Sequence, residues 1–513
     1  MTPLRGPETI SAAVPGLSAV QSLGHKAARG ALAMVFGQIG RLTIQLAGVL
    51  VLARVLSPEH YGAFGMVTVI VSVGELLQDF GLSSAAIQAP TVSAAQQTNL
   101  FWINTGIGLT LAVLVFAGAP LVAAFYHEPM LIPITRALAP SFVMNGLASQ
   151  FRAHLTRNFQ MTALSVAVVS AQAAGITAGL IGALHGLGTW ALVAQQLTFT
   201  FVNLAVMVKA ADFWPALPRR NTDIGAFLRF GGNLMATNLI GHISRSVNTV
   251  LIGNRFGAEL AGLYDRAFML LMLPLNQINV PANTVALPTL SKLQHDPARF
   301  ERFLLHGQTV LLHALLGAFA YAAAVGDVLI GIVMGEQWLP AAPLFRILTV
   351  AGAFQAAGYA TYWAFTAKAL THQTLRFAIV TRSGLVLLLF GGLRWGVTGV
   401  TVAYALGILC MWPVGLVWLA RCSDAPALAM AKNGVRCLLA YTACALGAYA
   451  AVCLVPGAGP FGKVAVSLLG MLGTMLLLFL AWPAYRADLY NIAHTRTLLS
   501  VWRVTPIDRK GTP

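Results

Sequence analysis

The chain has 513 residues, of which 57% are hydrophobic and only 9% are charged, and its formal net charge is +16. Soluble globular proteins carry about 25% charged residues, so this composition excludes an ordinary soluble enzyme, a disordered tail and a disulfide scaffold. Because one membrane-spanning helix uses about 20 apolar residues, the hydrophobic residues suffice for roughly 14 spans. The sequence therefore predicts an integral membrane protein.

The first half of the chain predicts a six-helix lobe. Residues 1–27 lack a continuous apolar core, so we expect a cytoplasmic N-terminal tail without a cleaved signal peptide. We assign residues 28–211 to the first lobe. Its apolar blocks are 28–55, 62–80, 98–125, 130–150, 162–185 and 188–210. These runs are far longer than the strands of a membrane barrel, so we expect α-helices.

A second lobe follows a polar, proline-containing connection at residues 212–223, which we expect to be a cytoplasmic loop. The second lobe is assigned to residues 224–422, and two more helices are expected within 430–484. Residues 485–513 then form a basic C-terminal tail. The apolar blocks of this half are 225–253, 258–279, 303–334, 342–366, 374–394, 397–420, 433–455 and 462–483. The fold class predicted is all-α, with about 14 transmembrane helices.

The basic residues indicate the orientation of these helices. They are scattered singly between apolar blocks, without the dense patch that nucleic-acid binding requires, so we expect no nucleic-acid partner. An even number of spans puts both termini on one side, and Lys and Arg fall mainly in the segments on that side. The positive-inside rule then predicts that both termini are cytoplasmic.

The chain contains an internal repeat. Its matching segments are Ser57–Phe64 with Gly257–Tyr264, Pro133–Leu138 with Pro343–Leu348, and Gly186 with Gly396. The first pair is separated by 200 residues and the other two by 210. Because each copy holds six spans, the copies have parallel topology, as in two-lobed transporters with a cavity between the lobes. The last two spans lie outside the repeat.

Polar side chains form two stripes at helical spacing. A charged residue inside a span costs at least about 2.5–3.5 kcal/mol, so each one needs a reason. The stripes comprise Gln38, Arg41 and Gln45 in the first span and Asn238, His242, Arg245 and Thr249 in the seventh. Steps of three and four residues place each stripe on one helix face. An offset of 200 residues superimposes the two stripes.

Further arginines fall inside the predicted spans. Arg382 lies in the eleventh span and aligns with Gln172 in the first lobe. Together with Arg41 and Arg245, Arg382 is deep in the apolar blocks, and we expect these three side chains to line a water-filled path.

For three other arginines two interpretations stay open. Arg136 and Arg346, which the repeat pairs, either line the same path or extend to the membrane surface. Arg266 either binds substrate or is neutralised by its neighbour Asp265.

Such a path favours an anionic substrate. The guanidinium group is planar, stays protonated and holds phosphate oxygens in pairs. An isolated phosphate would face a very large free-energy cost in crossing about 30 Å of hydrocarbon, and arginines along the path would lower it. The sequence shows no clustering of cysteine or histidine typical of a metal site, so we expect no metal and no cofactor.

Six segments resemble the polysaccharide transporter family, the Wzx-like lipid-linked oligosaccharide flippases of the multidrug/oligosaccharidyl-lipid/polysaccharide (MOP) superfamily. They are Leu52–Gly62, Gln78–Leu82, Ala86–Gln88, Arg245–Gly253, Gly262–Ala267 and Leu287–Gln294. The resemblance covers roughly residues 28–480. It implies a MATE-like fold of two pseudo-symmetric six-helix lobes plus two C-terminal helices, which alternate between inward-open and outward-open states.

The resemblance also implies a function. The substrate would be an undecaprenyl-diphosphate-linked repeat unit, moved across the bacterial inner membrane for O-antigen, capsule or exopolysaccharide synthesis, and a polysaccharide polymerase and a chain-length regulator would be partners. An ion gradient or the membrane potential would drive transport. The family often has an acid where Asn248 stands, which leaves Glu75, with Asp265 second, as the candidate for ion coupling.

Two other functions compete with this one. A related exporter of drugs or small cations would need buried acids, whereas this chain has arginines. A membrane polymerase or ligase would be expected to carry a long non-cytoplasmic loop with catalytic residues, but the predicted loops on that side are short and no nucleophile–base pair is evident. We therefore expect a transporter and not an enzyme.

Overall fold

The computed structural model describes residues 40–41, 43–79, 82, 92–218 and 225–493, with the backbone alone at 79, 226–234, 236–245 and 371. Within these residues the regular elements are all helical and no strand occurs. Ten helical segments of the described chain are long and apolar enough to cross a membrane. The all-α membrane fold is thereby confirmed, while the count of fourteen helices stays a prediction.

The helices follow the predicted blocks closely in the first half. A short apolar helix, Thr43–Val55, comes first. The next helices are α2 (Pro58–Asp79), α4 (Ala94–Tyr126), α5 (Leu131–Leu138), α6 (Pro140–Arg157), α7 (Met161–Leu184) and α8 (Thr189–Ala210). The fourth predicted span, 130–150, is thus two helices, because Pro140 lacks the N–H that would continue α5 and instead begins α6.

The second half contains the longest helical segment, α9 (Gly225–Lys292). The spans predicted at 225–253 and 258–279 meet in it at Gly257, whose φ of 83° breaks the helix. The second helix runs past the predicted end and includes three prolines, which membrane helices tolerate. The remaining helices are α10 (Pro297–Met334), α11 (Ala342–Ala367), α12 (Thr371–Gly392), α13 (Gly396–Cys422), α14 (Ala427–Leu454), α15 (Pro460–Ala481) and α16 (Pro483–Ala493).

The backbone reproduces the internal repeat. Phe159, between α6 and α7, and Ala369, 210 residues later between α11 and α12, both have positive φ, at 55° and 53°. The amide of Phe159 donates to the Thr156 carbonyl, and the amide of Ala369 donates to Thr366, both at 3.1 Å. Because non-glycine residues rarely adopt this conformation, its recurrence at the same offset supports a duplicated unit.

Contacts divide the chain into two compact units. Unit 1 comprises residues 1–55, 70–123 and 129–242, and unit 2 comprises 56–69, 124–128 and 243–513. The boundaries cut through α2, α4 and α9. The lobe boundaries predicted from the sequence, with the connection at 212–223, therefore stay a prediction.

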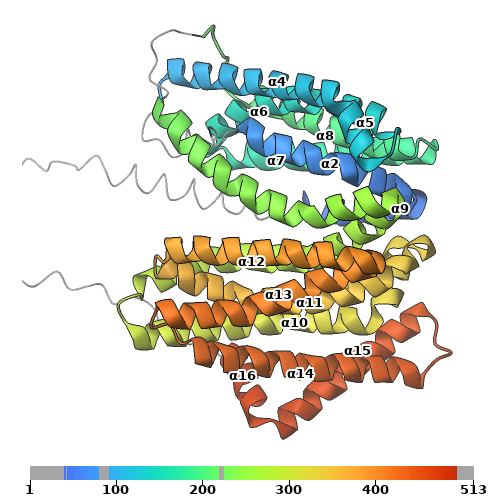
Figure 1. The fold of residues 1–513 in the computed structure, drawn as a ribbon, viewed down its shortest axis with the longest axis vertical. Helices are drawn as coiled ribbons and strands as arrows, with labels where there is room; N and C mark the ends of the chain where they lie inside the picture. Colours follow the sequence, from blue (N-terminus) through green and yellow to red (C-terminus); the bar gives the residue numbers. More distant parts are fainter. Residues whose placement is uncertain (1–39, 42, 80–81, 83–91, 219–224, 494–513) are drawn as a thin grey trace, which may run out of the picture. The chain divides into compact units, whose positions relative to one another are not determined.

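Each unit is a helix bundle with small residues at its close contacts. In unit 1, α7 packs on α8 and α6 on α8. Gly175, Gly179 and Gly182 of α7 lie against α8, as in the small-residue interfaces of membrane helices. In unit 2, α11 packs on α10 and α13, and α14 packs on α10 and α15 (Figure 1).

Helix α15 presents a row of exposed leucine side chains. On α15 the side chains of Leu469, Leu472, Leu476 and Leu480 are each more than half exposed. Leucines at this spacing, facing outwards, are typical of a helix that faces acyl chains.

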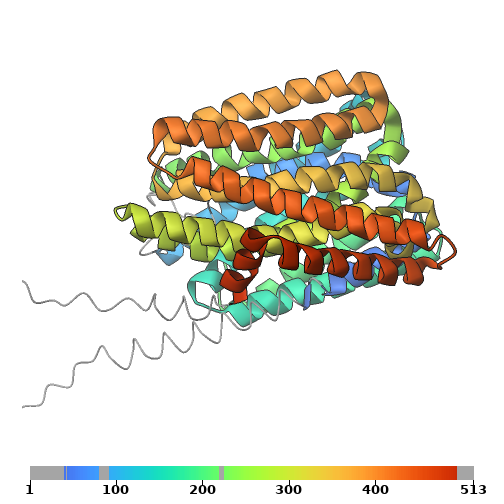
Figure 2. The same ribbon diagram turned by 90° about the horizontal axis from the view of Figure 1, so that it is seen from below.

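The short helix α16 lies where the sequence predicted only a basic tail. Figure 2 shows it turning back from the end of α15 (dark red). Arg436 Nε and Nη2 in α14 donate to the Asp488 carboxylate, at 2.8 and 2.7 Å. This pair of a half-buried arginine and a buried aspartate fixes α16 to the bundle of unit 2.

Candidate substrate path

Arg382 of α12 lies beside a row of aromatic side chains in unit 2. This aromatic row consists of Tyr264 and Phe268 in α9 and Tyr404 in α13. Tyr264 stacks on Phe268 with ring centroids 5.8 Å apart, and Phe268 meets the edge of Tyr404 at 5.5 Å. Arg382 is half-buried and close enough to the Tyr404 hydroxyl to interact with it electrostatically.

The aromatic row continues to a buried amide. The Asn248 side-chain nitrogen donates to the Tyr264 hydroxyl at 2.9 Å, and the neighbouring Thr249 is buried too. The row therefore extends from Asn248 of α9 to Tyr404, the residue with which Arg382 interacts electrostatically. The sequence analysis did not single out Tyr264 or Tyr404 as site residues. Tyr264 could have been found, because it belongs to a repeat motif.

Arg266 and Asp265 form an ion pair. Arg266 Nη2 lies 2.6 Å from Asp265 Oδ2, and the two side chains are 17% and 29% exposed. The guanidinium group also lies 4.5 Å from the centre of the Tyr61 ring. Of the two interpretations left open for Arg266, the structure shows the contacts of the neutralised pair.

The repeat-related residues Arg136 and Arg346 have different partners. Arg346 Nη2 bonds Asp327 Oδ1 at 2.7 Å, and both side chains are partly exposed. Arg136 is exposed and lies 5.1 Å from the centre of the Phe116 ring. Asp327 was not singled out in the sequence, because helical periodicity gives no information on which residue faces it from another helix.

Unit 1 holds one deep arginine whose side chain is described. Arg41 is half-buried, has no carboxylate partner among the described residues, and its Nε is buried without a hydrogen-bond partner. Gln45, one turn later, and Gln172 of α7 are half-buried as well. An uncompensated cation of this kind is rare within a membrane and is by default a functional candidate.

Glu75 of α2 has a defined partner in unit 1. Asn145 Nδ2 of α6 donates to Glu75 Oε1 at 2.8 Å, and Arg152 is close enough to interact electrostatically. The carboxylate is half-buried. Asn145 was not singled out in the sequence.

Four residues of the two predicted polar stripes have side chains outside the described part of the structure. Gln38 lies outside the described residues, and the side chains of Asn238, His242 and Arg245 lie outside them as well.

Two repeat-related glycines in unit 2 allow helices α2 and α9 to come into close backbone contact. Gly62 of α2 packs on the Ala258 carbonyl, and Gly262 of α9 packs on the Pro58 carbonyl, so that the two contacts are related by the 200-residue offset. We call these four residues the glycine crossing. The repeat predicted that the two segments are equivalent but not that they touch.

Three potential metal ligands also lie together in unit 2, namely His313, Cys437 and Asp488. The sequence did not indicate this group, because its members come from α10, α14 and α16. Arg436 occupies both oxygens of Asp488, so the carboxylate already has a cationic partner. In the arrangement observed, Asp488 of this group attaches α16 to α14.

Residues 51–343 match the family described as polysaccharide biosynthesis protein. The lipopolysaccharide biosynthesis protein WzxC of Escherichia coli K12 is 26% identical over 396 residues, covering 75% of this chain and 79% of WzxC. The succinoglycan biosynthesis transport protein ExoT of Rhizobium meliloti is 25% identical over 62% of this chain and 64% of its own length.

Solved structures share the fold at low sequence identity. The lipid II flippase MurJ in an inward closed conformation has a TM-score of 0.67 at 14% identity, covering 88% of this chain and 98% of MurJ. An inward-facing multidrug MATE transporter of the MOP superfamily has a TM-score of 0.60 at 14% identity, covering 77% and 99%. Together, these comparisons confirm the family resemblance and the MOP-type fold class predicted from the sequence.

Proposed function

Since the chain belongs to the polysaccharide biosynthesis protein family, we propose that it is a flippase for undecaprenyl-diphosphate-linked oligosaccharides in the bacterial inner membrane. The observation that carries the proposal is this family match across an all-helical membrane fold. The similarity to WzxC and ExoT supports a role in polysaccharide synthesis or transport. Both termini are proposed to be cytoplasmic, and a polymerase and a chain-length regulator are proposed partners.

The proposed mechanism uses arginines to carry a diphosphate through the membrane. Arg382 carries a planar guanidinium group close enough to the Tyr404 hydroxyl, at one end of the aromatic row, to interact with it electrostatically. The guanidinium group binds phosphate oxygens in pairs. The aromatic rings beside it form no ionic contact with the phosphate, so the substrate is not held too tightly to move on. We retain the sequence prediction that Arg41, Arg245 and Arg382 line one aqueous path that alternates in access between the two sides of the membrane.

The competing enzymatic function has less support. The connections between α7 and α8 (185–188), α12 and α13 (393–395), and α14 and α15 (455–459) are short in the described chain. They leave no room for a catalytic domain at that end of these helix pairs.

Proteoliposomes test the proposed function directly. Purified protein is reconstituted with a fluorescent lipid-diphosphate oligosaccharide, and a membrane-impermeant quencher reports the leaflet that holds the label. We expect the label to exchange between leaflets only in vesicles that contain the protein. Movement of a cationic drug into the same vesicles, with no exchange of the lipid, would favour the exporter and overturn the flippase.

Glu75 is expected to couple transport to an ion gradient. Glu75→Gln keeps an oxygen that accepts the hydrogen bond from Asn145 but removes the charge that a proton or sodium ion would neutralise. We expect gradient-driven flipping to fall about tenfold, which corresponds to about 1.4 kcal/mol in the barrier, while flipping without a gradient is unchanged.

Proteoliposomes with an imposed proton or sodium gradient measure this effect. Glu59→Gln is the matched control, since Glu59 lies on the same helix α2 with an exposed side chain. If Glu75→Gln retains the full response to both gradients, Glu75 has no coupling role.

A further inference from the structure

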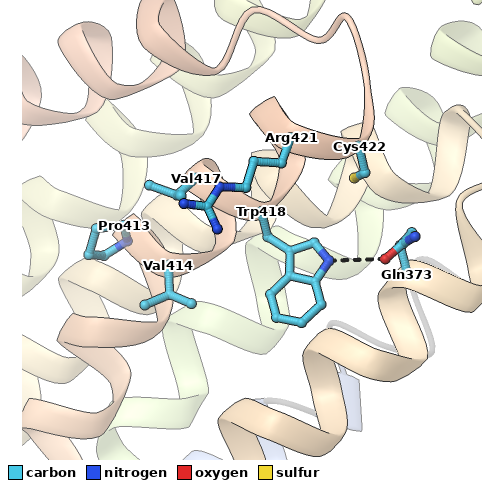
Figure 3. A pocket seen from close by; sticks show the side chains of 7 residues that line it. All are labelled: Gln373, Pro413, Val414, Val417, Trp418, Arg421 and Cys422. Atoms are coloured by element: carbon cyan, nitrogen blue, oxygen red, sulfur yellow. Dashed lines mark hydrogen bonds between the residues drawn. The ribbon is translucent and has the colours of Figure 1, made fainter.

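A cavity of about 680 Å³ lies between the adjoining ends of α12 and α13 in unit 2. Figure 3 shows Arg421 and Trp418 of α13 on one side and Gln373 of α12 on the other. The side chains of Pro413, Val414 and Val417 line the part that extends along α13. None of these residues belongs to the candidate substrate path.

The charge at the mouth of the cavity is uncompensated. Arg421 is exposed and has no carboxylate partner among the residues that the structure describes. The nearest acid along the chain is Asp424, which accepts a hydrogen bond from the Lys368 ammonium group. This hydrogen bond lowers the pKa of Asp424, so that its carboxylate stays ionised and bound to Lys368.

Two polar side chains are held beside Arg421. Trp418 Nε1 donates to Gln373 Oε1 at 3.2 Å, and the Trp418 ring meets the edge of Phe377 with centroids 5.9 Å apart. The indole is thereby fixed as a wall of the cavity. Gln373 lines the cavity, and its amide nitrogen is a hydrogen-bond donor, which suits an anion.

The rest of the cavity is apolar and faces outwards. Val414 and Val417 are 42% and 52% exposed, and they lie two turns and one turn of α13 before Arg421, respectively, towards the middle of the span. The cation at the end of the helix matches the anionic headgroup of a lipid. The apolar slot that leads from it into the span matches the first segment of an acyl chain. A free anion would use the mouth of the cavity alone.

The repeat provides an internal comparison. An offset of 210 residues places Ala163, Val208 and Ala211 of the first half where the second half has Gln373, Trp418 and Arg421. Those three residues belong to an apolar cluster in unit 1 with Phe213 and Met207. The fold therefore does not require a polar mouth at this helix pair.

We propose that this cavity binds an anionic glycerophospholipid. Arg421 holds the phosphate, Trp418 lies at the level of the glycerol backbone, and an acyl chain lies along Val414 and Val417. Basic pockets between membrane helices bind acidic headgroups in this way, and tryptophan is enriched at that depth. The inference is independent of the proposed function, because it concerns a resident lipid and not the transported one.

Native mass spectrometry of the purified full chain with added phosphatidylglycerol tests the proposal. We expect Arg421→Ala to weaken retention of phosphatidylglycerol about tenfold, the loss of one charge-assisted contact. Arg394→Ala, at the opposite end of the same helix pair, is the matched control and should bind like the unaltered protein. Equal retention by Arg421→Ala and the unaltered protein overturns the proposal.

Two further arms separate lipid from other ligands. Val417→Phe, which fills the apolar slot and keeps Arg421, should also weaken binding of phosphatidylglycerol; unchanged binding would overturn the acyl-chain contact and with it the lipid assignment. Phosphatidylethanolamine should be retained more weakly than phosphatidylglycerol. If inorganic phosphate displaces phosphatidylglycerol at equal concentration, the cavity is a site for soluble anions and the lipid proposal fails.

Discussion

Arg382→Ala is expected to reduce flipping of the lipid-linked substrate about a hundredfold while the protein still reaches the membrane. A bidentate contact between arginine and phosphate contributes about 1.5–3 kcal/mol, and about 2.7 kcal/mol is a hundredfold in rate. The side chain lies half-buried beside Tyr404 in the aromatic row, a position that does not anchor the helix at the membrane surface. Its loss therefore affects passage of the anion more than insertion.

The measurement is polymer export in cells together with flipping in proteoliposomes. Arg394→Ala, in the turn that follows α12, is the matched control, because it removes an exposed arginine from the same helix pair. Arg245→Ala is expected to behave like Arg382→Ala, and Arg245→Lys should also lose activity because an ammonium group cannot reproduce the planar fork. Normal export by both alanine variants would remove the hypothesis of an anion path lined by arginine.

Gly262→Leu is expected to abolish transport and to lower thermal stability. A Cβ atom at this position would overlap the Pro58 carbonyl, a backbone atom that cannot turn aside. The two helices of the glycine crossing must then separate, and overpacking of this kind costs about 1–3 kcal/mol or more. The repeat-related Gly62→Leu, which meets the Ala258 carbonyl, is expected to have the same effect.

Thermal unfolding of the purified protein, with flipping measured in parallel, checks this prediction. Gly65→Ala is the matched control, since Gly65 lies on the same helix α2 as Gly62 and a Cβ there meets nothing within 4 Å. Alanine at that position should be neutral or slightly stabilising, because it restricts the unfolded chain more than glycine does. A Gly262→Leu protein as stable and active as the unaltered chain would show that the crossing is not tightly packed in the membrane.

Several contacts could not be predicted because they join residues from different helices. Helical periodicity placed Arg346 inside a span, but its partner Asp327 lies on α10 and Arg346 on α11. The amide that holds Glu75 comes from α6, 70 residues further along the chain. Periodicity identifies the face of a helix on which a residue lies, whereas the neighbour of that face depends on how the bundle packs.

Some features were available in the sequence and were missed. Tyr264 belongs to the repeat motif, yet only its charged neighbours Asp265 and Arg266 were singled out. The helix α16 was assigned to a basic tail, because Asp488 and Tyr485 have no apolar block around them. Its position depends on Arg436 in α14, which supplies the charge that Asp488 needs when buried.

The sequence by itself determined the class of the protein, its helices and its duplication. The composition indicates a membrane protein. Within the bilayer only helices or a closed barrel satisfy the backbone hydrogen bonds, and the long apolar runs indicate helices. The 210-residue offset likewise predicted equivalent positions, which the turns at Phe159 and Ala369 reproduce. Only the tertiary structure decided which charges are compensated, as in Asp327–Arg346, and which are not, as in Arg41. The physical reason is that the free energy of a buried charge depends on the groups within a few ångströms of it, and those groups come from distant parts of the chain.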